Sequence, residues 1–522
     1  VAFAEGIGKL ADAGADIIVD DIGWLTMPMF QEGPIAQAVN EVKARGVSYF
    51  SAAGNSARKS YEQNTLINQV SGSNDNAHDF GLAAGEASDF YQKIIIPAET
   101  NIRISFQWSS PYEIAYAEQG ATSDLDIFLF NATKNEVVAQ STDNNIGHNP
   151  VEFLSYTTTA DTESDTFYLY VRHMAGDNPR KLKYILYGPG LLESEPAEKV
   201  FLQPNPDGQY RLVDVNNAEI TEGQAVIVLP TENTRFNIIP LDVTQVIRNE
   251  AGFPEISLVQ GIIDLSTQDI WFVPNGFVAV VLRNGEVVLI AEDAENTATF
   301  IANYHTHSST VVGHANASGA ISVGAMSYKQ TPWFNGSRSI ESFSSAGGTP
   351  ILYDAKGELL DEPEYHLSPA IIAVDDIDTT FFPFIAEEAD SNQNGLPNFK
   401  GTSAAAPNAA AVAALLLQKY PYLNPDNVKQ SMMQGTVDLT DPANVSNEKI
   451  LDFNPCAADV VFDWGTGCGL LQADLMFAAV PDLPIDSSFG DFNGNGCIDT
   501  EDQERLISAL RFNANNIAFD LN

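Results

Sequence analysis

The most informative segment of the chain reads Phe399-Lys400-Gly401-Thr402-Ser403-Ala404-Ala405-Ala406-Pro407. Gly401 lets the backbone turn without a Cβ, and the small residues after it predict a buried helix that packs closely against neighbouring backbone. Pro407 is expected in the first helical turn, where its missing N–H costs little. A helix start favours negative charge that develops beside Ser403, so this serine is a candidate nucleophile. The alternative is an ordinary buried helix capped by Thr402 or Ser403.

A second motif lies far upstream, at Tyr49-Phe50-Ser51-Ala52-Ala53-Gly54-Asn55. Gly-Thr-Ser-x-Ala-x-Pro resembles the nucleophile motif of the subtilases, the subtilisin-like serine peptidases, and a strand that ends in Ala-Gly-Asn resembles their oxyanion-binding strand. The resemblance implies that Ser403 attacks the peptide carbonyl and that the Asn55 side-chain amide binds the oxyanion. A neutral amide stabilises developing negative charge without titrating.

Residues 1–55 have an α/β pattern, with helices predicted at 3–13 and 35–44 and strands at 15–20 and 47–52. This order is similar to the subtilase core after its catalytic histidine. The resemblance implies that the substrate cleft is lined by Asp21, Ile22, Gly23 and Gly54. Asp21 stands where a serine is commoner, which leaves the specificity open.

The catalytic aspartate and histidine of the family precede this region, in the order Asp, His, Ser. None of the seven histidines, at 78, 148, 173, 305, 307, 314 and 366, has the expected His-Gly-Thr context. His314 precedes a predicted strand and is interpreted as structural. His305 and His307 have a metal-ligand spacing but lack accompanying ligands. We therefore expect that residue 1 is not the natural start and that the missing triad members lie upstream.

The long stretch between the two motifs predicts insertions into the peptidase core. Residues 72–190 contain alternating strands separated by turn residues, which predict a β-sandwich. The segment at 123–129 resembles pre-peptidase C-terminal-type domains. Its Asp124 and Asp126 could bind calcium, but we favour the interpretation that they alternate onto a solvent face. Residues 191–304 predict a second β-rich segment of unknown type.

Residues 305–482 are expected to complete the core that residues 1–71 begin. A linker at 483–489 then leads into a different module at 490–522. Its loop has the calcium-binding register of an EF-hand, with the glycine at position 6 and oxygen ligands expected from Asp491, Asn493, Asn495, the Cys497 carbonyl, Asp499 and Asp502. The final Asp502 resembles dockerin repeats, which implies a cohesin-type partner. Residues 518–522 resemble the start of a second repeat, so the chain is expected to be cut at both ends.

The charge excludes several classes of partner. With 26 basic and 69 acidic residues, the net charge is −43, which argues against nucleic acid and anionic membranes. No run of about 18 apolar residues is present, so no membrane insertion is predicted. Cys456 and Cys468 could form a disulfide, which would leave Cys497 without a cysteine partner.

These patterns predict an α/β fold: an incomplete subtilisin-like three-layer core with a parallel sheet, a large β-sandwich insertion and a small calcium-loop tail. The resemblance implies a secreted, extracellular serine endopeptidase that acts on polypeptides through an acyl-enzyme, and that is inactive without its base. One alternative is a pseudopeptidase scaffold that docks through a dockerin–cohesin contact. Another is the sedolisin type, which uses a glutamate base and an aspartate at the oxyanion site; Asn55 favours the subtilisin type.

The acidic loop at 491–502 has too many like charges to fold well without its cation. Calcium chelation is therefore expected to unfold residues 490–522 and to leave the core intact. Hydrogen exchange measured with and without chelator checks this. Unchanged protection of the helix at 503–510 after chelation would contradict it.

Overall fold

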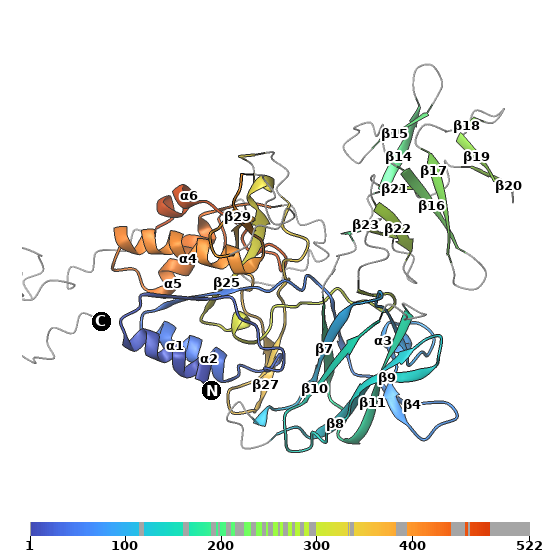
Figure 1. The fold of residues 1–522 in the computed structure, drawn as a ribbon, viewed down its shortest axis with the longest axis horizontal. Coiled ribbons are helices and arrows are strands. Elements are labelled where there is room, and N and C mark those ends of the chain that lie inside the picture. The colour runs from blue at the N-terminus through green and yellow to red at the C-terminus, as the bar shows by residue number, and fades with distance from the viewer. Residues whose placement is uncertain are drawn as a thin grey trace, which may run out of the picture.

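The computed structural model describes residues 2–113, 120–159, 166–188, 299–331, 333–334, 339–382, 394–439, 455–457 and 460–480, together with the backbone of the strands between Glu195 and Ala291. Of the described residues, those within 2–58 and 305–480 form an α/β part, and those within 60–187 and 299–304 form a two-sheet β part (Figure 1). The predicted linker and calcium-loop tail at 483–522 lie outside the described residues.

The α/β part is built on a six-stranded sheet in the order β1-β2-β25-β28-β32-β31. Every neighbouring pair is parallel except β31 and β32. The elements of this part are α1 (Ala2–Asp12), β1 (Ile17–Asp20), α2 (Pro34–Ala44), β2 (Ser48–Ala52), η3 (Gly313–Asn316), β25 (Ala320–Ser327), η4 (Tyr328–Gln330), β26 (Ile351–Tyr353), β27 (Leu359–Glu364), β28 (Ile371–Asp375), β29 (Ile377–Asp378), β30 (Asn398–Phe399), α4 (Thr402–Lys419), α5 (Pro425–Gln434), β31 (Thr436–Val437), β32 (Leu470–Leu471) and α6 (Ala473–Ala478).

Helices cover both faces of this sheet. α1 and α2 lie on one face and α4, α5 and α6 on the other, which gives three layers (Figure 1). Adjacent residues of β2 point to opposite faces, as strand geometry requires: Tyr49 packs with α1 and α2, and Phe50 packs with α4. The buried alanines of α4 allow this helix to lie close to β25 and β28. A mixed α/β fold with a parallel-strand sheet was therefore predicted correctly.

The α4 helix differs from its prediction in one respect. It begins at Thr402 after a cap at Gly401, so that Pro407 lies inside the helix rather than in its first turn. Proline lacks the N–H that would donate to the Ser403 carbonyl four residues earlier. Neither Thr402 nor Ser403 caps the helix with its side chain.

The two-sheet β part has one sheet in the order β10-β7-β12-β3 and a second built on β24-β6-β11-β5-β4 with β8 and β9. One buried apolar cluster lies between the sheets and includes Phe106, Trp108, Ile127 and Leu129. The elements are β3 (Ser60–Asn64), β4 (Ile67–Gln69), β5 (Asn76–His78), α3 (Phe80–Ala83), β6 (Gln92–Ile95), β7 (Asn101–Trp108), β8 (Ser123–Asn131), β9 (Glu136–Ser141), β10 (Val151–Thr157), β11 (Thr166–Gly176), β12 (Lys181–Tyr187) and β24 (Phe300–Ile301).

The two-sheet β part begins earlier than the predicted boundary at residue 72. β3 pairs with β12 and β4 pairs with β5, so the chain leaves the α/β part before residue 60. The chain returns at β24, which pairs with β6. The interpretation of Asp124 and Asp126 as solvent-facing was wrong, because both residues are buried. Burial and the neighbouring Asp124 raise the pKa of Asp126 to about 6.

The strands between residues 195 and 291 form three further antiparallel sheets, ordered β13-β23-β22, β15-β14-β21-β16-β17 and β18-β19-β20. They are β13 (Glu195–Pro196), β14 (Lys199–Pro204), β15 (Tyr210–Val213), β16 (Gln224–Pro230), β17 (Phe236–Asp242), β18 (Ile247–Arg248), β19 (Pro254–Leu258), β20 (Gly261–Asp264), β21 (Ile270–Val273), β22 (Phe277–Val281) and β23 (Val287–Ala291). The β-rich character predicted for this segment is therefore observed.

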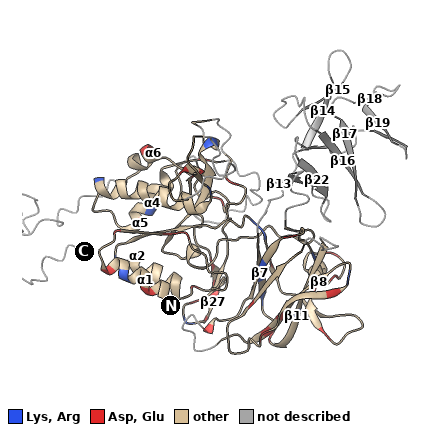
Figure 2. Cartoon of the chain, viewed as in Figure 1, with Lys and Arg blue, Asp and Glu red and all other residues tan. Residues whose placement is uncertain are grey.

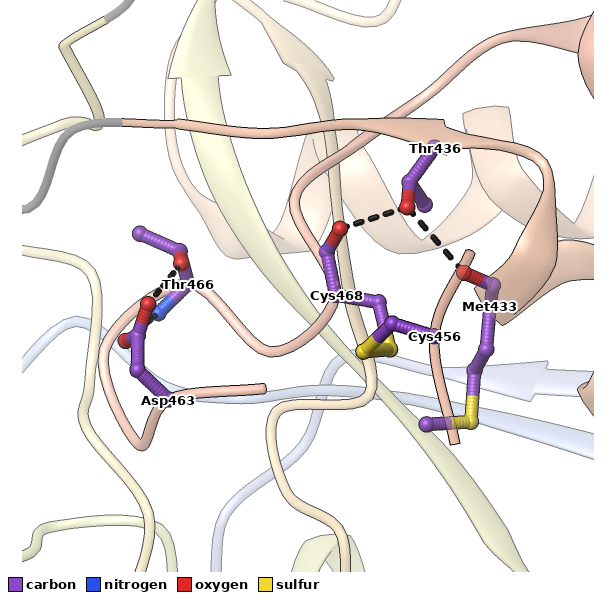
Figure 3. Close-up of a disulfide and its surroundings, with 6 residues drawn as sticks. All are labelled: Met433, Thr436, Cys456, Asp463, Thr466 and Cys468. Atoms are coloured by element: carbon purple, nitrogen blue, oxygen red, sulfur yellow. Dashed lines mark hydrogen bonds between the residues drawn. A yellow bond between two sulfur atoms is a disulfide. The ribbon is translucent and has the colours of Figure 1, made fainter. Parts of the chain in front are cut away.

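A disulfide joins Cys456 to Cys468 beside the end of the central sheet (Figure 3). The Thr436 hydroxyl donates to the carbonyls of Met433 and Cys468, which ties the end of α5 to the same loop. Acidic positions occur on both the α/β part and the two-sheet β part (Figure 2). Within the described ranges, no helix combines the length and apolar character needed to cross a membrane.

Candidate active site

The candidate site lies at the carboxyl ends of β1 and β2, where α4 begins. In parallel sheets this edge collects loops from several strands, which is why ligands commonly bind there. A cavity of about 350 Å³ opens at this edge. It is lined by Asp21, Ile22, Gly23, Trp24, Leu25, Met27, Ala52, Ala53, Gly54, Asn55, Ser56, Tyr187, Gly188, Thr310, Val312, Gly313, His314, Ala315, Ser345, Thr402 and Ser403.

Asn55 is held against the start of α4 by its side-chain oxygen. Asn55 Oδ1 accepts hydrogen bonds from the Thr402 backbone N–H at 3.0 Å and from the Thr402 hydroxyl at 2.8 Å. The Gly54 N–H donates to the same hydroxyl at 3.1 Å. Because the oxygen of the Asn55 amide accepts these two hydrogen bonds, its Nδ2 group remains as a donor, and it lies next to Gly401.

Gly401 is required at the turn before the nucleophile candidate. Its φ of +130° lies in the region that side chains disfavour, and a Cβ there would lie 3.2 Å from Asn55 Nδ2. The Gly401 N–H donates to Asp375 Oδ2 at 2.6 Å. The turn is thus fixed from one side by Asn55 and from the other by Asp375.

Ser403 lines the cavity and is half-buried. Its hydroxyl has no hydrogen-bond partner within the described part of the chain. His314 is the histidine that lines the same cavity, but its Nε2 atom lies 3.1 Å from Asp20 Oδ1. The Tyr49 and Ser51 hydroxyls also donate to Asp20. Within the described residues His314 makes no hydrogen bond to Ser403, and its interpretation as structural stays a prediction.

The structure brings together all six residues that the sequence singled out for this site: Asp21, Ile22, Gly23, Gly54, Asn55 and Ser403. Sequence reasoning missed the walls formed by the loop after Gly23, by the segment at 310–315 and by Tyr187 and Gly188. No motif marks these residues, because they reach the cavity only through tertiary packing. Among the described residues that line the cavity, none is a lysine or an arginine.

The described residues offer no metal site beside this cavity. His305 Nε2 contacts the Arg58 carbonyl at 3.0 Å, and burial beside His307 holds the pKa of His305 well below its usual range. Among the residues that the structure describes, no group of three or more His, Cys, Asp or Glu side chains is placed to hold a metal ion. The six predicted calcium ligands at 491–502 lie outside those residues.

Comparison with known proteins supports the class of this site. Residues 295–450 match the model of the subtilase family. The chain therefore carries a segment, residues 295–450, that is similar to the subtilase family. No curated protein was found to match the chain.

Among solved structures, the chain is similar to the prenylagaramide maturation protease PagA. The two proteins share 18% sequence identity with a TM-score of 0.20, and the matched part covers 33% of this chain and 46% of the protease. The chain thus spans less than half of that protein, and the likeness carries no further argument.

Two carboxylates, the buried Asp375 and the partly buried Glu341, lie behind the Gly401 turn. Burial raises the pKa of Asp375 from 3.8 to about 7; the Gly401 N–H opposes this shift, whereas the nearby Glu341 adds to it. Burial also raises the pKa of Glu341, although Lys400 lies 3.4 Å away and opposes that shift. The folded protein therefore holds a proton on Asp375 that the unfolded chain releases at lower pH.

This difference predicts a pH-dependent stability. The contribution of Asp375 to stability should fall as pH rises from 3.8 towards 7, because only the folded state keeps the Asp375 proton there. Asp375→Asn cannot ionise, so its free energy of unfolding should exceed that of wild type increasingly with pH, by roughly 1–3 kcal/mol at neutral pH and above. Urea unfolding across this range measures the difference. The exposed Asp361→Asn variant serves as control, and its free energy of unfolding should change with pH as that of wild type does. The same pH dependence in Asp375→Asn as in wild type would contradict the assignment.

Proposed function

We propose that the protein is a secreted endopeptidase of the subtilisin type that cleaves peptide bonds through an acyl-enzyme. The observation that carries this proposal is the pairing of Asn55 Oδ1 with Thr402, which holds Asn55 against the start of α4 on the cavity that Ser403 also lines. A nucleophile and a neutral donor on one cavity are the parts that acyl transfer needs.

In the proposed reaction, Ser403 Oγ attacks the carbonyl carbon of the scissile peptide bond. The carbonyl oxygen becomes negative and accepts hydrogen bonds from Asn55 Nδ2 and from the Ser403 backbone N–H. Collapse of this intermediate releases the amine and leaves an ester on Ser403, which water then hydrolyses. The start of α4 adds a favourable field for the negative oxygen.

The serine also needs a base to take its proton. Among the described residues no hydrogen bond joins His314 to Ser403, and His314 lacks the His-Gly-Thr context expected of the base. We propose that a histidine outside residues 1–522, oriented by an aspartate, supplies it. The absence of a described partner on the Ser403 hydroxyl also fits the alternative of a pseudopeptidase scaffold, and the two are separated by activity of the full-length protein.

The remaining modules are proposed from sequence patterns, and the location is proposed from the disulfide. The two-sheet β part is proposed as an inserted β-sandwich of the pre-peptidase C-terminal type. The tail at 490–522 is proposed as a dockerin-like module that binds Ca²⁺ and a cohesin-type partner. The Cys456–Cys468 disulfide supports an extracellular location, since such bonds persist in oxidising compartments.

Labelling with a serine-directed phosphonate tests the mechanism. The chain of residues 1–522 should label at Ser403 far more slowly than an intact serine peptidase treated alongside, because its serine lacks a base. In the full-length protein, Ser403→Ala should abolish cleavage, and Asn55→Leu should lower kcat by about 10²–10³ with little change in KM, the loss known for subtilisin's own oxyanion donor. Rapid labelling of residues 1–522 would contradict the missing base. An inactive full-length protein would favour the scaffold.

The charge of the cavity predicts a substrate preference. Asp21 is exposed on its lining and no lysine or arginine lies beside it there, so a lysine side chain of the substrate should be favoured over its uncharged isostere norleucine. Asp21→Asn should remove up to about 1 kcal/mol of this preference, roughly fivefold in Kd. Fluorescence anisotropy with labelled peptides and the Ser403→Ala background measures it. Equal preference in the Asp21→Asn and parent proteins would contradict this role.

A further inference from the structure

The sheet that contains β7 and β12 is buried on both faces over residues 105–107 of β7 and 183–185 of β12. Its inner face contributes Ile104, Phe106 and Tyr184 to the cluster between the two sheets. Alternate residues point the other way, and Gln107 and Lys183 on that outer face are also fully buried. A sheet of a two-sheet β structure normally turns its outer face to water. Here the α/β part covers it, and β7 runs beside that part (Figure 1).

Gln107 holds the loop that follows β1. Its Nε2 group donates to the Met27 carbonyl at 2.9 Å, and its Oε1 atom accepts from the Met29 N–H at 2.8 Å. The neighbouring Ser105 hydroxyl donates to the Leu25 carbonyl. One amide thus pairs with the backbone of two alternate residues, as a neighbouring strand would. Leu25 and Met27 both line the cavity.

β12 holds a second wall of the same cavity. Lys183 Nζ donates to Ser309 Oγ and to Glu62 Oε2, each at 2.9 Å. Ser309 Oγ lies 2.7 Å from the hydroxyl of Thr349, which donates to the Val311 carbonyl. This chain of hydrogen bonds fixes the segment that carries Thr310 and Val312 into the cavity lining.

Further along β12, Ile185 packs with Met29 and Phe30, and Tyr187 joins this cluster together with Val312. Tyr187 and the following Gly188 line the cavity themselves. The outer face of β12 therefore continues directly into the candidate substrate site.

We propose that the outer face of the β7–β12 sheet is a wall of the substrate pocket. Gln107 and Lys183 are positioning residues that hold the two loops of the pocket, and Tyr187 is a specificity-determining residue that limits the size of the side chain accepted. The two-sheet β part is thus a component of the peptide-binding site. The identity of the ligand rests on the proposed peptidase function. The hydrogen bonds by which Gln107 and Lys183 hold the two loops, here called the clamp, do not depend on it.

Hydrogen exchange in the ligand-free chain of residues 1–522 tests the clamp without reference to activity. Gln107→Met keeps a similar volume and removes both hydrogen bonds. It should raise exchange at the Met29 amide at least about tenfold. Gln140→Met, on the exposed β9 strand, is the matched control and should leave this amide unchanged. Unchanged exchange in Gln107→Met would overturn the clamp.

Peptide binding in the Ser403→Ala background tests the wall. Gln107→Met should weaken peptide binding about five- to tenfold. Tyr187→Ala should shift the preferred side chain towards larger aromatic groups, whereas Tyr187→Phe should keep the wild-type order. An unchanged order of preference in Tyr187→Ala would overturn the assignment of Tyr187. If the parent protein binds no peptide while the exchange result stands, the peptidase proposal fails and the clamp remains.

Discussion

The hydrogen bonds between the Asn55 amide and Thr402 join two segments that are 347 positions apart along the chain. They hold the end of β2 against the start of α4 and orient the amide at the same time. The turn before Ser403 depends on this junction. Gly401 must be a glycine because the Asn55 amide occupies the space beside its missing Cβ, and Asp375 holds the turn from its other side.

The two segments of the junction can meet despite the long stretch of chain between them, because the central sheet continues from β2 directly to β25. β2, from the first part of the chain, pairs in parallel with β25, which follows the stretch. The two-sheet β part leaves after β2 and returns before β25 without interrupting the sheet. Its outer face is then buried by the loops of the α/β part, so that Lys183 and Glu62 form an ion pair in the interior. A buried charge is tolerated only when it is paired and hydrogen-bonded, and Ser309 and Lys181 complete this pairing.

Local patterns accounted for most of the secondary structure. The alanine-rich run predicted α4. Asn424 caps α5, and its side chain accepts from the Asn427 N–H at 2.9 Å. Local sequence patterns did not predict burial or domain boundaries that depend on a segment far away in the chain. Asp124 and Asp126 alternate as solvent-facing residues do, yet they are buried, and β3 lies before the predicted boundary because its partner β12 is far along the chain.

The sequence by itself determined which residues are the candidates for the chemistry, because a nucleophile and an oxyanion donor need particular side chains in particular local turns. Ser403 after Gly401 and Asn55 after Gly54 could therefore be found without a structure. Only the tertiary structure decided what surrounds them. The roles of Gln107, Lys183 and Tyr187 depend on how one sheet packs against two loops, and residues that act through packing carry no local signature.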